Sequence, residues 1–142
     1  MDEPITIRDE RPLRVLVEAP APWNWAVKEA KSLPGVEVTY CPGPATHTDL
    51  PCPVTAGQGC WRAEDADVII AGLGVNYAEG RRIVRGLREQ HPDTPVVVLA
   101  WRTDVLRDDG LLDGCETVVF PWTTHKVREA VERALGVVFE PV

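Results

Sequence analysis

Three cysteines and one histidine fall within a single irregular stretch of the chain, residues 41–62, which is rich in proline and glycine. They are Cys41, His47, Cys52 and Cys60. Three thiolates and an imidazole can complete a tetrahedral zinc site, and three thiolates can anchor most of an iron–sulfur cluster. Ten and then seven residues separate the successive cysteines, so the short paired C-x-x-C pattern of a zinc knuckle is missing. Reduced cysteines, a metal or cluster site, and a reversible disulfide such as Cys52 with Cys60 all remain open.

Aromatic residues form a second candidate site. Four of the five tryptophans and one tyrosine follow apolar runs of the sequence: Trp23, Trp25, Tyr77, Trp101 and Trp122. Tryptophan and tyrosine are enriched where proteins dock, because they bury a large area and still offer a polar tip. The alternative is that these rings fill space and close the core.

The elements that position these residues can be predicted from hydrophobic periodicity. Residues 1–11 lack such a pattern, so we expect a flexible N-terminal tail followed by a single domain over residues 12–142. Strands are expected at Leu13–Val17, Val36–Tyr40, Val68–Ala71, Val96–Ala100 and Glu116–Phe120, and helices near 23–33, 79–89, 105–112 and 124–135. Between residues 41 and 62, prolines and glycines exclude a helix of more than one turn, so a loop is expected in place of the second crossover helix.

Strands that alternate with helices in a chain of 142 residues predict a doubly wound α/β domain. We expect a five-stranded parallel sheet of flavodoxin-like type, with strand order 2-1-3-4-5. In such sheets, ligand-binding and catalytic residues lie beyond the carboxyl ends of the strands. The five aromatic residues are all expected at this edge.

From Asp65 to Leu135 the sequence resembles a bacterial response-regulator receiver domain. The resemblance is carried by Asp67-Val-Ile-Ile70, Glu79-Gly80, Leu87-Arg-Glu89, the run from Pro92 to Leu99, and Phe120-Pro121. It implies a fold in which an aspartate at the end of the third strand accepts a phosphoryl group. It also implies an acidic pair that binds magnesium, a serine or threonine on the fourth strand, and a lysine before a cis-proline on the fifth.

The chain departs from this family at the positions that carry the chemistry. Gly72 occupies the phosphoacceptor position, Ala100 the hydroxyl position and Phe120 the lysine position, although Pro121 is retained. Only Glu18 lies near the position of the acidic pair, and one carboxylate is a poor magnesium site. The resemblance therefore implies a degenerate receiver, or pseudo-receiver, that is not phosphorylated and is not an enzyme.

Charge and composition narrow the classes of partner. With a formal net charge of −7, the chain lacks the basic character that nucleic acids or anionic membranes attract. No stretch approaches the roughly 20 apolar residues that span a bilayer, and residues 1–10 lack the apolar core of a signal peptide, so we expect a cytoplasmic protein.

These observations predict a stand-alone signalling module that acts by protein–protein interaction through the carboxyl edge. The identity of the protein partner is left open, a second copy of the chain included. No resident cofactor is assigned, with zinc or an iron–sulfur cluster kept for the cysteine alternative. Two other functions stay open: a metal or thiol redox sensor that uses the loop from Cys41 to Cys60, and a flavodoxin-like domain that binds a small molecule or catalyses a reaction.

Overall fold

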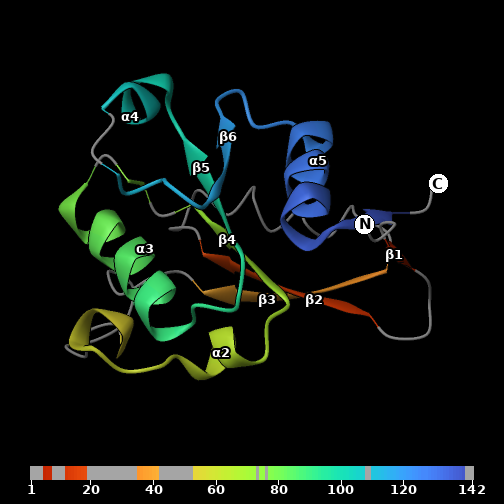
Figure 1. The fold of residues 1–142 in the computed structure, drawn as a ribbon, viewed down its shortest axis with the longest axis horizontal. Coiled ribbons are helices and arrows are strands. Elements are labelled where there is room, and N and C mark those ends of the chain that lie inside the picture. The colour runs from red at the N-terminus through yellow and green to blue at the C-terminus, as the bar shows by residue number, and fades with distance from the viewer. Residues whose placement is uncertain are drawn as a thin grey trace.

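A five-stranded parallel sheet organises the domain (Figure 1). In the computed structural model, the described residues are 5–7, 12–18, 35–41, 53–72, 74–75, 77–107 and 110–139. The strands of the sheet are β2 (Leu13–Glu18), β3 (Val36–Cys41), β4 (Val68–Ala71), β5 (Val96–Ala100) and β6 (Glu116–Val119). Their order is β3-β2-β4-β5-β6, which is 2-1-3-4-5 when only these strands are counted. The predicted fold class and strand order are confirmed.

Helices cover both faces of the sheet. Helix α5 (Thr124–Leu135) packs on one face, where it buries Val127, Ala130 and Val131 against Val15, Val17 and Ile70. Helix α3 (Ala78–Gln90) packs on the other face and buries Ile83, Val84 and Leu87 against Leu16, Ile69 and Val98. Alternate residues of β2 thus enter two different cores, as the two-residue period of a strand requires. The predicted helix at 124–135 matches α5, while the expected helix at 23–33 lies outside the described residues.

The described part of the segment before β4, residues 53–67, packs on α3. It holds a 3₁₀ turn, η2 (Pro53–Ala56), and a four-residue helix, α2 (Trp61–Glu64). Gly86 of α3 allows η2 to approach, because a Cβ at this position would collide with the backbone carbonyl of Val54. Gly86 therefore makes close packing of η2 on α3 possible.

Two sequence predictions need correction. Ile5–Ile7, within the expected flexible tail, forms strand β1 and pairs in parallel with β7 (Val137–Phe139), which was not predicted. A three-residue strand has too short a pattern to be recognised, and its partner lies at the other end of the chain.

The second correction concerns the helix that was expected near residues 105–112. Helix α4 instead spans Arg102–Leu106, and a turn follows at 111–114. The helix begins early because Asp104 caps it: its Oδ2 atom accepts a hydrogen bond from the backbone N–H of Trp101 at 2.8 Å.

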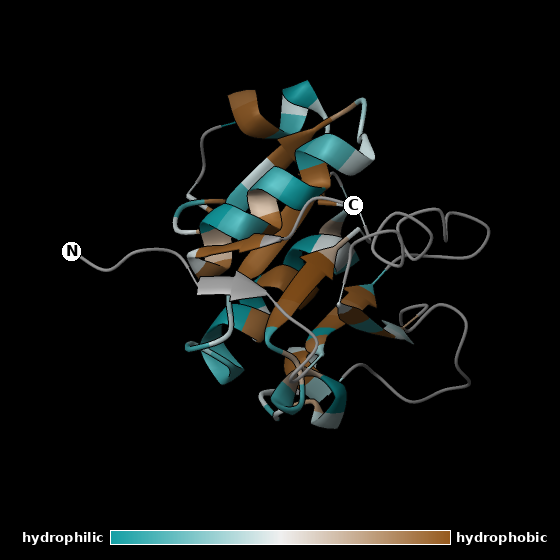
Figure 2. Ribbon diagram, turned by 90° about the vertical axis from the view of Figure 1, so that its right-hand side faces the viewer, coloured by the Kyte–Doolittle hydropathy of each residue, from teal (hydrophilic) through white to brown (hydrophobic). Residues whose placement is uncertain are grey.

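Hydropathy follows this layered arrangement. Figure 2 shows hydrophobic strands between helices whose outward faces are mostly hydrophilic. Within the part of the chain that the structure describes, no helix has the length and apolar character needed to cross a membrane.

Candidate interaction site

Three aromatic rings meet at the carboxyl edge of the sheet. Trp101 stacks on Phe120 with ring centroids 4.4 Å apart. Trp122 meets both rings edge-on, with its centroid 5.2 Å from that of Trp101 and 5.1 Å from that of Phe120. Stacked and edge-to-face pairs at these distances are the favoured arrangements of aromatic rings. We call Trp101, Phe120 and Trp122 the aromatic cluster.

The aromatic cluster forms because β5 and β6 are adjacent and end together. Ala100, the last residue of β5, lies opposite Val119, the last residue of β6. The backbone N–H of Phe120 donates to the carbonyl of Ala100 at 2.9 Å, which extends the pairing by one residue. Parallel pairing therefore brings together residues that are nineteen positions apart in the sequence.

Trp122 is tied to the sheet beneath it. Its indole N–H donates to the carbonyl of Ala100 at 3.1 Å and to that of Val118 at 3.0 Å. The ring is half-buried and packs against the core on the α5 face. Trp122 thus joins β5 to β6 and forms a base for the other two rings.

Trp101 and Phe120 present the open side of the aromatic cluster. Trp101 is 43% exposed and Phe120 is 49% exposed. Helix α4 begins directly after Trp101 and adds two exposed apolar residues, Val105 and Leu106. Large exposed apolar side chains that gather in one place are typical of an interaction surface.

The other predicted aromatic residues are not brought into this cluster by the described contacts. Tyr77, at the start of α3, is exposed and makes no ring contact with the cluster among the described residues. Trp23 and Trp25 lie outside the described residues. Trp61, which was not predicted to take part, is 64% exposed on α2, where the guanidinium of Arg62 lies over its ring.

Sequence reasoning missed Lys126 at this edge. Its ammonium donates to the carbonyl of Val119 at 2.8 Å and to that of Pro121 at 3.0 Å. The backbone N–H of Lys126 also donates to the Thr123 hydroxyl, which caps α5. No local sequence signal identifies it, because the first turn of a helix favours acidic residues, and the two carbonyls that the ammonium binds precede the helix.

Three of the positions that the resemblance assigns to receiver chemistry, Gly72, Ala100 and Phe120, carry no carboxylate, hydroxyl or ammonium group. Gly72 has no side chain and donates its backbone N–H to the carbonyl of Glu18. Ala100 is fully buried, and Phe120 belongs to the aromatic cluster. Pro121 follows a cis peptide bond. A magnesium ion would find only the carboxylate of Glu18 among these five positions, so they do not fit the metal.

Glu18 is a buried carboxyl group at the end of β2. It is 2% exposed, and within the part of the chain that the structure describes its Oε1 atom has no hydrogen-bond partner. Burial raises the pKa of Glu18 to about 7, against an ordinary value of 4.5, while the positive charge of Arg62 acts in the opposite direction. Cys41 on β3 and Ala71 on β4 lie opposite Glu18 in the sheet. The carboxyl group thus lies in surroundings that favour its neutral form.

The cysteine candidates are only partly described. Cys41 is half-buried on β3 and Cys60 is buried at the start of α2, and both pack on the α3 side of the sheet. His47 and Cys52 lie outside the described residues. Among the residues that are described, no three of His, Cys, Asp and Glu are grouped to hold a metal ion. The four-residue site therefore stays a prediction.

The two histidines outside that loop behave differently from each other. His91 is buried, and its Nε2 atom accepts a hydrogen bond from the backbone N–H of Cys60 at 2.9 Å. That bond connects the end of α3 to the start of α2, a contact between distant segments that the sequence does not reveal. His125 is exposed at the start of α5 and contacts Glu129.

Comparisons with known proteins establish the fold. No protein-family model matches the chain, and no curated protein matches it by sequence. Among solved structures, a response regulator receiver domain protein from Clostridium thermocellum superposes with a TM-score of 0.61 at 17% identity, over 87% of this chain and 94% of that one. The chemotaxis protein CheY4 from Vibrio cholerae gives a TM-score of 0.58 at 18% identity, over 87% and 99% of the two chains. A putative pilus assembly-related protein from Burkholderia pseudomallei gives 0.61 at 14% identity, over 89% and 92%. The chain therefore has a receiver-like fold.

Proposed function

We propose that this chain is a pseudo-receiver: a receiver-like signalling module that is not phosphorylated, catalyses no reaction, and acts by binding a protein partner. The observation that carries the proposal is the aromatic cluster. It occupies the ends of β5 and β6, where the resemblance places a hydroxyl group and a lysine, and two of its rings are close to half exposed.

The physical argument rests on what is accessible at this edge. The polar remnant, Glu18, is buried, whereas Trp101 and Phe120 face solvent. Aromatic residues are enriched among the side chains that dominate binding energy at interfaces. The rigid support beneath them, through the hydrogen bonds of Trp122, lowers the entropy cost of docking. An apolar partner surface therefore suits the site better than a charged one.

The proposal is tested by partner capture with matched tryptophan variants. Tagged wild-type protein, Trp101→Ala and Trp61→Ala are used to capture proteins from the source cells, with quantitative mass spectrometry as the readout. Both residues are exposed tryptophans, but only Trp101 belongs to the aromatic cluster. We expect Trp101→Ala to lose the captured partner and Trp61→Ala to retain it, because removing an interface anchor commonly costs about 2 kcal/mol or more of binding energy.

Two controls make the result decisive. Circular dichroism of each variant checks that the fold is intact, and analytical ultracentrifugation tests a second copy of the chain as the partner. Equal capture by wild type and Trp101→Ala, with unchanged self-association, would contradict the proposal.

A further inference from the structure

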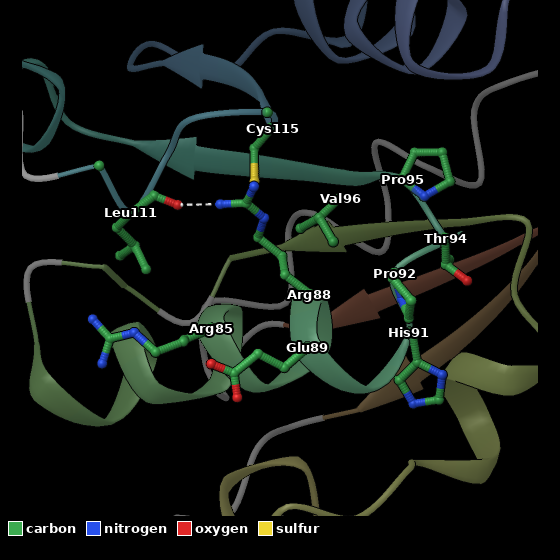
Figure 3. A pocket seen from close by; sticks show the side chains of 12 residues that line it. Arg85, Arg88, Glu89, His91, Pro92, Thr94, Pro95, Val96, Leu111 and Cys115 are labelled. Carbon is green, nitrogen blue, oxygen red and sulfur yellow. Dashed lines mark hydrogen bonds between the residues drawn. The ribbon is translucent and has the colours of Figure 1, made fainter.

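A hollow of about 590 Å³ lies at the opposite, amino edge of the sheet. Its walls are the C-terminal half of α3, the turn before β5, and the turn at 110–115 before β6. The lining includes Arg85, Arg88, Glu89, Thr94, Val96 and Cys115 (Figure 3). Pockets that bind small molecules are commonly about 300–1,000 Å³ in volume, so the hollow is of suitable size.

Arg88 is held in place within this hollow. One of its guanidinium nitrogens, Nη1, donates to the carbonyl of Leu111 at 2.9 Å, and Figure 3 shows the side chain extending from α3 towards Leu111 and Cys115. Gly114 leaves the space that the guanidinium needs, because a Cβ there would come within 2.8 Å of Arg88 Nη2. Gly114 also has a φ of +82°, a conformation that disfavours other residues. The position of Arg88 is therefore largely set before any ligand binds.

Two arginine side chains line the hollow. Arg85 lies one helical turn before Arg88, and among the described residues neither guanidinium forms an ion pair with a carboxylate. By contrast, Arg82 of the same helix pairs with Glu79 at 3.2 Å.

Among the side chains that line the hollow, Arg85 and Arg88 are positive and Glu89 is negative. Asp113, in the turn at 110–115, does not line the hollow, but its charge acts on Cys115, which does. Two guanidinium groups without a carboxylate partner can bind an anion.

We propose that this hollow binds a small organic anion whose single phosphate or carboxylate group lies between Arg85 and Arg88. Guanidinium groups match the geometry of both oxyanions and form charge-assisted hydrogen bonds with them. Val96 and Leu111 supply apolar wall for the remainder of the molecule. Glu89 repels a second anionic group, which limits the ligand to one. This site is separate from the aromatic cluster and does not depend on the function proposed for it.

The test uses two probes that share an apolar ring and differ in the oxyanion: phenyl phosphate and benzoate. Each is titrated at low ionic strength into the full chain, and binding is followed by backbone amide shifts. We expect saturable shifts in residues 85–96 and 110–115, and the tighter probe identifies the oxyanion. Arg85→Gln should weaken binding about tenfold, because it removes one charge-assisted contact.

Arg82→Gln is the matched control, since it removes the same charge from the same helix outside the hollow and should leave affinity within about twofold of wild type. Glu89→Gln should tighten binding, because it removes the repelling charge. Absence of saturable binding of both probes at millimolar concentration, equal weakening in Arg85→Gln and Arg82→Gln, or weaker binding in Glu89→Gln would each overturn the proposal.

Discussion

The two halves of the carboxyl edge differ in the side chains that they bury and expose. At the end of β2, Glu18 keeps a carboxyl group but buries it, with Oε1 lacking a hydrogen-bond partner in the described residues. At the ends of β5 and β6, Ala100 and Phe120 stand at the positions of the hydroxyl group and the lysine, and Trp122 donates its indole N–H to two backbone carbonyls. The first arrangement costs stability, because a buried polar group without partners is unfavourable. The second contributes stability through ring contacts and hydrogen bonds.

As a result, the titratable side chain of Glu18 is buried, whereas the side chains that a partner can reach include apolar rings. A partner that approaches the described part of this edge meets Trp101 and Phe120, while the carboxyl group of Glu18 is out of reach. If the proposed partner docks on these rings, its binding should depend little on ionic strength, because salt screens exposed charges and not apolar burial. The predictions below test this comparison.

The largest effect is expected at Glu18. In the folded protein its pKa is raised to about 7, so the folded state holds a proton that the unfolded chain releases near pH 4.5. Stability is therefore lost as pH rises from 4.5 towards 7, and the loss is complete above that range. At 1.36 kcal/mol per pH unit, the cost to the folded state is about 3 kcal/mol at pH 8. Glu18→Gln should recover about this amount at pH 8 and less than about 1 kcal/mol at pH 5, measured by urea unfolding.

Glu37→Gln provides the control for Glu18→Gln, since Glu37 is an exposed carboxylate on the neighbouring strand. Its effect should stay within about 0.5 kcal/mol at both pH values. If Glu18→Gln lowers stability at pH 8, the carboxylate is stabilised by a partner and the contrast between the two halves of the edge fails.

The next largest effect on the free energy of unfolding is expected at Trp122. Trp122→Ala removes two hydrogen bonds and a half-buried ring that packs on the core, and should lower the free energy of unfolding by about 2 kcal/mol. Trp61→Ala, at a well exposed position, should cost less than about 0.5 kcal/mol. Chemical denaturation of both variants checks the difference. Equal stabilities would mean that Trp122 does not support the sheet.

A smaller effect on stability is expected at Phe120. Because about half of its surface is exposed, Phe120→Ala should lower the free energy of unfolding by no more than about 1 kcal/mol. Partner capture should nevertheless fall as it does for Trp101→Ala, since both rings form the open side of the aromatic cluster. A variant that unfolds at the same denaturant concentration as wild type yet still captures the partner would show that Phe120 is not part of the interface.

The last prediction is that a phosphoryl donor does not modify the protein. Incubation with acetyl phosphate and magnesium should leave the intact mass unchanged, because Gly72 has no carboxylate and Phe120 no ammonium at the receiver positions. Beryllofluoride, which mimics a phosphoryl group, should also fail to bind. A phosphoryl adduct on Glu18, Asp67 or Glu79 would show that the edge retains chemistry and would contradict the pseudo-receiver proposal.

Hydrophobic periodicity was sufficient to predict the main sheet. Val68–Ala71 and Val96–Ala100 are unbroken apolar runs, and both are strands buried on two faces with the predicted bounds. Short elements escaped prediction: β1 depends on pairing with β7 at the far end of the chain, and α4 begins where the side chain of Asp104 caps it. Such contacts are decided by neighbours that a local window does not contain.

For the candidate site, the sequence by itself determined which residue types stand at the ends of β5 and β6, because the bounds of these strands follow from their apolar runs. Only the tertiary structure decided how those residues are used. It placed the ring of Phe120, the residue at the lysine position of the resemblance, against the rings of Trp101 and Trp122. It also buried the side chains of Glu18 and His91. It also placed Arg85 and Arg88 beside a hollow at the other edge. The physical reason is that the burial of a side chain and its contacts depend on which strands and turns lie side by side. That arrangement is set by the packing of the whole chain.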